Sequence, residues 1–342
     1  MSNEPIKHIL SSLSGFLPFK SLMPANRQHF IFPFWHAVSD HPPDHLSVLY
    51  QMPSSAVFKK DLDFFLKHYK AASIVQVEEF ANRKIGSKLN LFFPSFDDGL
   101  SECYHTIAPI LKSKGIPAAF FINPDFVDNK QLFHRHKASL ILNHLKEKLP
   151  TISQLKAAEI IEGKPTADQD LRRFLNHTVY SDHAELDRIA MIFGIDFSEY
   201  LKQKKPYMSL SQIQELQNDG FIIGGHSLDH REFYQAPERE ILHQISGSMD
   251  FVVQELKPEK KWFAFPYTDS KIPDSVFGHA IQEKIWDQSF GTAGMKDETM
   301  PNHIQRIPME SGELMSAEKM IRTEYAWYAL KSIFGKNKVN RR

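Results

Sequence analysis

The sequence has one cysteine, few glycines and no net charge. Because Cys103 is the single cysteine among 342 residues, an internal disulfide is excluded and a reducing compartment is expected. Basic and acidic side chains each number 41, and this balance gives no reason to expect nucleic-acid binding. Internal repeats, low-complexity segments and long apolar runs are also missing, so neither a solenoid nor a membrane-spanning helix is predicted.

The first 22 residues lack the features of a secretory signal. They contain Lys7 and Lys20, but no continuous apolar segment and no small-residue cleavage site. A cytoplasmic location is therefore expected. Hydrophobic residues, in contrast, make up 42% of the chain and include 27 phenylalanines, which indicates a globular protein with a large core.

An apolar segment that ends in two carboxylates is the most informative stretch. Residues 91–96 read Leu-Phe-Phe-Pro-Ser-Phe, and Asp97, Asp98 and Gly99 follow them. The segment predicts a buried strand with a distortion at Pro94, and the glycine permits a sharp turn after it. Two adjacent carboxylates repel each other, so their burial favours a bound cation, with one aspartate as ligand and the other transferring protons.

Two histidines further along the chain offer neutral nitrogen ligands. Residues 226–230 read His-Ser-Leu-Asp-His. If this segment is a helical turn, His226 and His230 lie on one face and can share one ion. One carboxylate and two imidazoles fit a catalytic divalent metal, zinc first, with cobalt and nickel as alternatives. Taken alone, each motif has a structural alternative, a capping aspartate or a surface turn.

Together with a third segment, these motifs resemble a known family. Residues 96–99, residues 226–230 and Phe265-Pro266-Tyr267 are similar, in this order, to motifs of the polysaccharide deacetylases, the NodB-like carbohydrate esterases. The resemblance implies an α/β fold, a distorted (β/α)7 barrel, here with a helical insertion. It also implies these site residues: Asp97 as general base, Asp98, His226 and His230 as metal ligands, Tyr267 as source of the oxyanion-binding amide, and Pro266 with Tyr267 as the wall of the sugar site.

Some positions depart from the family's pattern. Ala264 or Phe265 stands where relatives carry an arginine bonded to the general base, so another group is expected to tune Asp97. The late Leu-x-His motif, the source of the general acid, has no clear counterpart. His303 and Arg306 are the candidates to face the site, and we assign Arg306 to substrate binding.

His36 is a further candidate near the beginning of the chain. It follows a predicted strand over residues 31–36, where similar deacetylases also carry a histidine. At the carboxyl end of that strand it would lie at the active-site edge of a barrel. A loop histidine bonded to the backbone is an equally good interpretation.

The predicted organisation has three parts. Residues 1–28 form an N-terminal helical extension, residues 29–310 the barrel with a helical insertion at about 125–206, and residues 311–342 a C-terminal helix and basic tail. Helical spacing predicts an N-terminal helix at Pro5–Leu17 and insertion helices that include Asp168–Asn176 and His183–Phe193. A short strand is predicted at Ser73–Val75. The aromatic, basic C-terminal end predicts either peripheral contact with an anionic membrane or a helix packed on the barrel.

We therefore expect a metal-dependent hydrolase that removes acetyl groups from an N-acetylated or O-acetylated sugar or polysaccharide. An acetylated sugar or glycan is the expected partner. Two alternatives remain open at this stage, a catalytically silent glycan-binding protein of the same fold and a metal-dependent amidohydrolase of a small non-glycan amide.

Overall fold

A computed structural model describes most of the chain. The residues described are 19–22, 30–82, 89–159, 168–310, 315–339 and 341. The predicted helix at Pro5–Leu17 lies outside them. Within the described ranges, no helix combines the length and the apolar character needed to cross a membrane.

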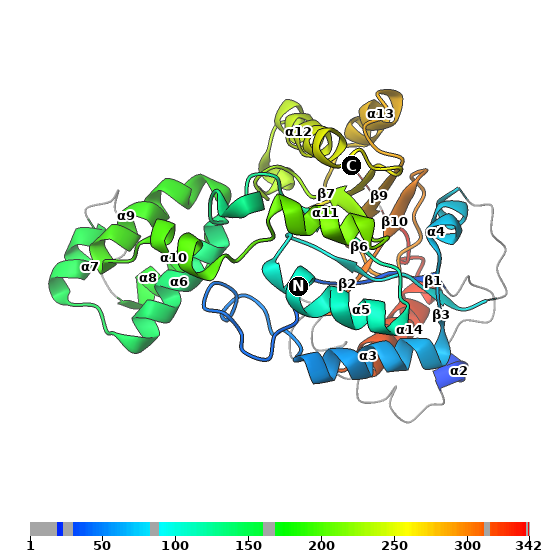
Figure 1. Ribbon diagram of the computed structural model, residues 1–342, viewed down its shortest axis with the longest axis horizontal. Coiled ribbons are helices and arrows are strands. Elements are labelled where there is room, and N and C mark those ends of the chain that lie inside the picture. Colours follow the sequence, from blue (N-terminus) through cyan, green and yellow to red (C-terminus); the bar gives the residue numbers. More distant parts are fainter. Residues whose placement is uncertain are drawn as a thin grey trace.

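A closed barrel of parallel strands forms the centre of the fold (Figure 1). Its eight strands are, in spatial order, β10 (His303–Gln305), β9 (Gln288–Gly291), β8 (Trp262–Ala264), β7 (Ile222–Gly225), β6 (Ala119–Ile122), β5 (Ser95–Phe96), β2 (Pro33–Trp35) and β11 (Ile307–Pro308). β10 and β11 belong to one segment, because only Arg306 separates them. That segment pairs with β9 on one side and with β2 on the other, so it closes the barrel. The predicted distorted (β/α)7 barrel is confirmed.

A small second sheet extends one side of the barrel. It consists of β1 (Phe30–Ile31), β4 (Leu91–Phe92) and β3 (Lys70–Ala71), in this order. The strand predicted around Pro94 is interrupted there, and the pairing partner changes from β3 before the proline to β6 after it. Because proline has no N–H to give to a ladder, the expected distortion coincides with this change of partner.

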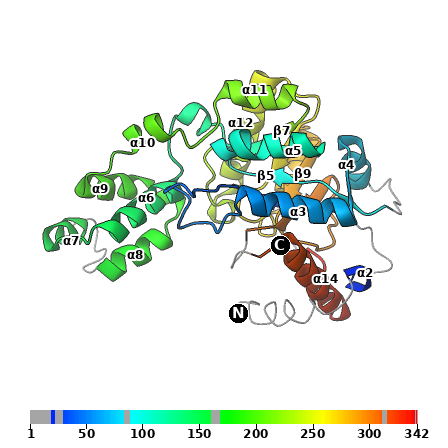
Figure 2. The ribbon, with the colours of Figure 1, turned by 60° about the horizontal axis from the view of Figure 1, so that its bottom comes forward.

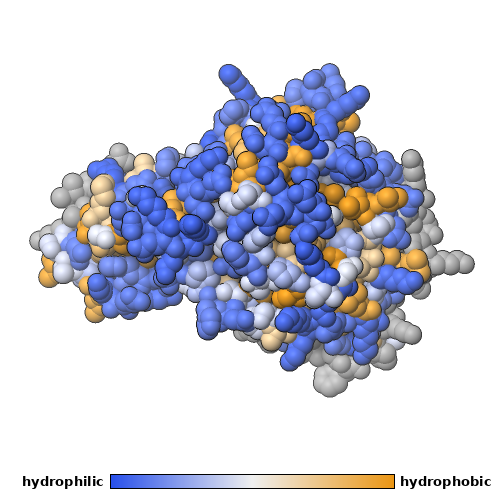
Figure 3. Space-filling model, viewed as in Figure 1, coloured by the Kyte–Doolittle hydropathy of each residue, from blue (hydrophilic) through white to orange (hydrophobic). Residues whose placement is uncertain are grey.

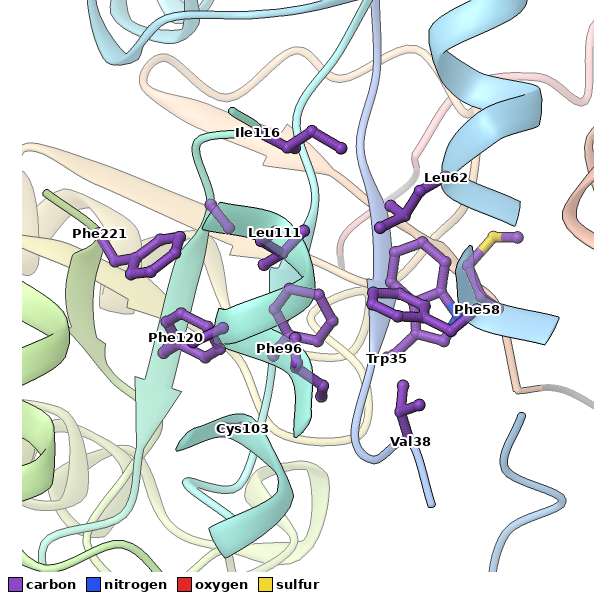
Figure 4. Close-up of a cluster of buried hydrophobic side chains, with 14 of the residues drawn as sticks. Trp35, Val38, Phe58, Leu62, Phe96, Cys103, Leu111, Ile116, Phe120 and Phe221 are labelled. Atoms are coloured by element: carbon purple, nitrogen blue, oxygen red, sulfur yellow. The ribbon is translucent and has the colours of Figure 1, made fainter. Parts of the chain in front are cut away.

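Helices surround the barrel (Figures 1 and 2). They are α2 (Phe19–Leu22), α3 (Ser55–His68), α4 (Ile74–Ala81), α5 (Ala108–Lys114), α11 (Leu210–Asn218), α12 (Glu238–Leu256), α13 (Asp274–Gln282) and α14 (Ala317–Ile333). Aromatic rings fill much of the space between helices and strands (Figure 4). The Phe96 ring, for example, stacks between Trp35 at 5.7 Å and Phe120 at 5.2 Å, measured between ring centroids.

The strand predicted at Ser73–Val75 is wrong. The chain forms α4 there, and the neighbouring strand is the two-residue β3. Ser73 begins the helix, because its hydroxyl accepts from the Gln76 amide while the Gln76 side chain accepts from the Ser73 amide. This reciprocal capping satisfies two backbone donors at the helix start and outweighs the β-propensity of isoleucine and valine.

Five helices between β6 and α11 form a lobe beside the barrel (Figures 1 and 2). They are α6 (His134–Glu147), α7 (Ile152–Glu159), α8 (Asp168–Asn176), α9 (His183–Phe193) and α10 (Phe197–Lys204). The bounds predicted for α8 and α9 are confirmed. The lobe has a core of its own, with Ile141, Leu171 and Leu186 buried together.

The C-terminal segment packs on the barrel. Trp327 and Tyr328 on α14 are buried, while Ile333 and Phe334 at its end are exposed. Beyond the helix, the chain returns to the barrel and buries the Arg341 side chain. The packed-helix alternative therefore describes this end of the chain. The surface in Figure 3 is largely hydrophilic, with hydrophobic residues scattered in small groups.

Candidate active site

Asp98, His226 and His230 meet at the carboxyl ends of β5 and β7. The Oδ1 atom of Asp98 lies 3.2 Å from Nε2 of His230 and 3.5 Å from Nε2 of His226. All three side chains are buried. One potential ligand atom from each lies within 4.8 Å of the others, so the group can hold one metal ion. We call these residues the Asp-His-His group.

The histidines reach this position from a loop, so the predicted helical turn is wrong. Residues 226–230 have no helical structure, and Ser227 and His230 adopt positive φ values of 67° and 57°. Hydrogen bonds hold the loop instead. The Ser227 hydroxyl accepts from the His230 amide at 3.0 Å, and the Asn123 amide group donates to the Ser227 carbonyl at 3.1 Å.

The donor set of the Asp-His-His group fits a divalent metal. Nδ1 of His226 lies 2.8 Å from the Ala264 carbonyl oxygen, so it donates its hydrogen there and leaves Nε2 free as a ligand. Burial lowers the pKa of His226 to about 4, although Asp97 opposes the shift, and the imidazole is neutral at pH 7. The buried Oδ1 of Asp98 makes no hydrogen bond within the described residues. One carboxylate facing two imidazoles suits zinc and similar ions.

Asp97 is held by a fully buried arginine. Nη1 and Nη2 of Arg306 donate to the two carboxylate oxygens of Asp97 at 2.7 and 2.8 Å, and Nη1 also donates to Ser95 Oγ at 3.0 Å. Burial alone would raise the pKa of Asp97, but the charge and hydrogen bonds of Arg306 outweigh it and keep the pKa below its usual value. The expectation that a group other than the family's arginine adjusts the pKa of Asp97 is confirmed, and that group is Arg306.

The position of Arg306 differs from its predicted contact with substrate. Its side chain is 0% exposed and lies behind Asp97, over the rings of Phe34 and Phe121. A guanidinium at this depth supports the carboxylate and has no access to a ligand. The sequence indicated Arg306 as a candidate, but Arg306 and Asp97 are 209 positions apart, and no sequence pattern at that separation reveals the pair.

His36 lies at the site from the carboxyl end of β2. Its Nδ1 is 2.6 Å from Oε2 of Glu310, and its ring stacks on Tyr50 at 4.5 Å between centroids. The Tyr50 hydroxyl in turn donates to Asp98 Oδ2 over 3.5 Å. Burial alone would lower the pKa of His36, but Glu310, followed by Asp98 and Asp97, raises it to about 9. Of the two interpretations of this histidine, the structure supports the active-site one.

His303 does not face the site. Its Nε2 lies 3.0 Å from Asp269 Oδ2 and its Nδ1 2.8 Å from Ser289 Oγ, so both ring nitrogens are engaged. Asp269, Glu298 and His303 form a second group that could hold a cation. The guanidinium of Arg341 supplies that positive charge, with bonds of 2.7 Å to Asp269 and 2.6 Å to Glu298.

Tyr267 borders the Asp-His-His group. Its ring centroid lies 4.8 Å from that of His230, and its backbone has a positive φ of 54°. Its carbonyl oxygen accepts from the Thr292 hydroxyl at 2.8 Å, while its amide has no hydrogen-bond partner among the described residues. Pro266 is buried and Tyr267 partly exposed, so Tyr267 is the member of the pair that a ligand can reach.

Sequence comparison decides the family. Residues 90–278, more than half of the chain, match the sequence model of the polysaccharide deacetylases. The chain belongs to the polysaccharide deacetylase family. It is accordingly a hydrolase that acts on carbon–nitrogen bonds other than peptide bonds. No curated protein sequence matches this polysaccharide deacetylase.

Two bacterial proteins are among the solved structures with the same fold. The Streptococcus pyogenes deacetylase PplD, in complex with acetate, is 14% identical, with 86% of this chain and 97% of that chain covered and a TM-score of 0.53. IcaB from Ammonifex degensii is 14% identical, with 88% and 98% covered and a TM-score of 0.54. At such identities the similarity concerns the fold.

Proposed function

We propose that this polysaccharide deacetylase removes the acetyl group from an N-acetylated sugar, with a metal ion held by the Asp-His-His group. The observation that carries the proposal is the pairing of two adjacent aspartates with different partners. Asp98 faces the imidazoles of His226 and His230, whereas Asp97 is held by Arg306. One carboxylate is thus available as a metal ligand and the other as a base.

A divalent metal, zinc first, would polarise the acetyl carbonyl and acidify a water molecule beside it. Asp98, His226 and His230 are the residues that would hold it. Asp97 accepts the proton of the attacking water, because its lowered pKa keeps it ionised at neutral pH. The two bonds from Arg306 fix the direction of that carboxylate.

The negative charge that develops on the acetyl oxygen needs a fixed donor. The Tyr267 amide can serve, since it has no partner among the described residues and its residue borders His230. The Tyr267 ring forms one wall for the sugar. Pro266, which precedes it, is buried, and its ring restricts the backbone before Tyr267.

His36 supplies the proton that an amine leaving group requires. Glu310 binds its Nδ1, which leaves the Nε2–H as the donor, and the raised pKa keeps the ring protonated at neutral pH. The His36 side chain is 19% exposed, the most open of the site's histidines. An alkoxide leaves without such help more readily than an amine does, so a protonated donor favours N-acetyl over O-acetyl substrates.

Metal titration combined with acetate release tests the proposal. Metal-free protein is supplied with zinc, cobalt or nickel, and acetate is measured from N-acetylglucosamine and its oligomers. His226→Ala should lose metal binding and activity together, whereas Asp97→Asn should keep the metal and lose at least a hundredfold in kcat. His243→Ala, at an exposed histidine on α12, is the control. Metal binding without acetate release from any acetylated sugar would overturn the assignment.

A further inference from the structure

Arg135 is an unpaired cation in the first turn of α6. Among the described residues it forms no hydrogen bond and no ion pair, although its side chain is half-buried. Neighbouring cations are paired. The Lys137 ammonium lies 2.7 Å from Asp187, and the Arg231 guanidinium lies 2.6 Å from Glu240.

The beginning of α6 borders the Asp-His-His group. The ring of Phe133, two residues before Arg135, lies 4.7 Å from that of His230, measured between centroids. Tyr267 packs against the same hydrophobic cluster as Phe133. The charge of Arg135 also acts on the hydroxyls of Tyr50 and Tyr267, where it opposes the rise in pKa that burial causes. The guanidinium is therefore close to both tyrosines that flank the metal ligands.

Four other charges at the site already form two ion pairs. Arg306 neutralises Asp97, and Glu310 is bound to His36. Glu232 faces His134, whose Nε2 lies 3.3 Å away. Burying a guanidinium without an anionic partner lowers the stability of the folded protein. The N-terminus of the 14-residue α6 adds further positive charge at this place.

We infer that the substrate is an N-acetylated sugar that carries an anionic group, a phosphate or a carboxylate, and that Arg135 binds this group beside the acetamido site. The inference rests on the proposed deacetylation and names its substrate class. A guanidinium offers two parallel N–H donors that match either anion. The insertion lobe would then have a function in selecting the substrate, since α6 belongs to it.

The test compares neutral and anionic sugars. Acetate release is measured from N-acetylglucosamine, its 1-phosphate and 6-phosphate, and N-acetylmuramic acid, which carries a carboxylate. We expect one anionic sugar to exceed the neutral one at least tenfold in kcat/KM, and this preference to fall as salt is added. A preference for a sugar phosphate or for N-acetylmuramic acid shows whether the anionic group of the substrate is a phosphate or a carboxylate.

Variants separate this role from catalysis. Arg135→Ala should reduce the anionic-over-neutral preference at least tenfold, mainly through KM, and Arg135→Lys should restore part of it. Arg188→Ala, on α9 in the same lobe, is the matched control, because that side chain is 57% exposed. An equal loss of kcat for neutral and anionic sugars in Arg135→Ala would overturn the inference and would place the charge at the reaction itself.

A binding experiment keeps this inference distinguishable from the proposed deacetylation. The preferred sugar phosphate and inorganic phosphate are titrated into Asp97→Asn protein with and without Arg135→Ala. Phosphate binding that depends on Arg135 would support the inference even if no acetylated sugar were hydrolysed. Binding that is unchanged in Arg135→Ala would overturn it even if deacetylation were established.

Discussion

At the scale of residues, the site depends on two neighbouring carboxylates that have different partners. Asp97 and Asp98 are adjacent in the chain, and both are buried. The positive φ of 72° at Asp98 turns the backbone, so one carboxylate faces Arg306 and the other faces His226 and His230. A non-glycine residue in this conformation is strained, and such strain is typical of functional sites.

Replacing Arg306 should affect stability and rate in different ways. Arg306→Ala leaves the buried Asp97 without its partner, so the free energy of unfolding should fall by about 3–5 kcal/mol in chemical denaturation. Arg306→Lys keeps the charge but cannot make both bonds, and kcat should fall at least tenfold with metal affinity little changed. Arg173→Ala, which breaks an exposed ion pair on α8, should cost less than about 1 kcal/mol.

The acidity of His36 should depend on Glu310. In metal-free protein the His36 ring should lose its proton near pH 9, as followed by NMR, because Glu310 outweighs the effect of burial. In Glu310→Gln the pKa should fall, and the alkaline limb of the pH–rate profile should move to lower pH with it. A profile that does not move would show that another group protonates the leaving amine.

The same pair also makes stability depend on pH. The folded-state pKa of His36 lies above its ordinary value of 6.5. Its contribution to stability is therefore complete below pH 6.5 and is lost as the pH rises through about 9. Denaturation curves across this range should show that loss in the wild type and a smaller one in Glu310→Gln.

At the scale of elements, β7 and its neighbours determine where His226 lies. A Cβ atom on Gly224 would come within 2.5 Å of the Trp262 carbonyl oxygen on β8 and within 2.7 Å of the Phe121 ring on β6. Only glycine allows the three strands to approach so closely. His226 follows two residues later, so the close packing of β7 between β6 and β8 also positions this member of the Asp-His-His group.

Gly224→Ala should therefore weaken both the fold and the metal site. We expect unfolding free energy to fall by about 2–3 kcal/mol, because the clash is with backbone as well as side chain. Metal affinity, measured by titration, should decrease with it. Gly278→Ala is the matched control. It lies in α13 with open space around it and should raise stability by about 0.5–1 kcal/mol. An unchanged metal affinity in Gly224→Ala would contradict this link.

Local signals explain which elements could be predicted from sequence. The bounds of α8 and α9 follow from helical spacing and turn residues. The strand predicted at Ser73–Val75 is wrong because the side chains of Ser73 and Gln76 cap each other's backbone amides, which outweighs the β-propensity of Ile74 and Val75. The conformation of residues 226–230 could not be predicted either, since Asn123, which follows β6, holds the loop.

In the site, too, local motifs could be predicted from sequence, whereas contacts between distant residues could not. The ligands and Asp97 could be found because each motif is short and follows a strand. The Arg306 pair and the His36–Glu310 pair span 209 and 274 residues, and only the closed barrel brings them together. Arg135 was visible only as a basic residue between two histidines, because its lack of a partner is a property of the folded chain.

At the scale of the whole molecule, the C-terminal segment supports the active-site loop. Arg341 lies over the ring of Phe277 at 4.7 Å and binds Asp269, two residues after Tyr267. Asp269 in turn accepts from the Thr292 amide at 3.0 Å, and the Thr292 hydroxyl donates to the Tyr267 carbonyl oxygen. A chain of contacts thus joins the segment after α14 to the residue that borders the metal ligands.

Removing the Arg341 guanidinium should loosen this loop. Arg341→Ala leaves Asp269 and Glu298 buried without their cation, so stability should fall by about 2–4 kcal/mol. Backbone amides at residues 267–269 should exchange faster with deuterium in hydrogen-exchange measurements. Lys338→Ala should behave as the wild type, because that side chain is exposed and the residue pairs with Asp297 through its backbone. Unaltered exchange in Arg341→Ala would separate this segment from the site.

Closure of the barrel by residues 303–308 has a consequence for the order of events during synthesis. A nascent chain that has emerged as far as β9 already contains Asp98, His226 and His230. It lacks Arg306 to hold Asp97 and Glu310 to keep His36 protonated. Contacts of such long sequence separation form late in folding. If the proposed metal site is correct, the growing chain would have all three ligands before it has the groups that hold Asp97 and protonate His36, and hydrolysis would begin only after the last strand has joined the barrel.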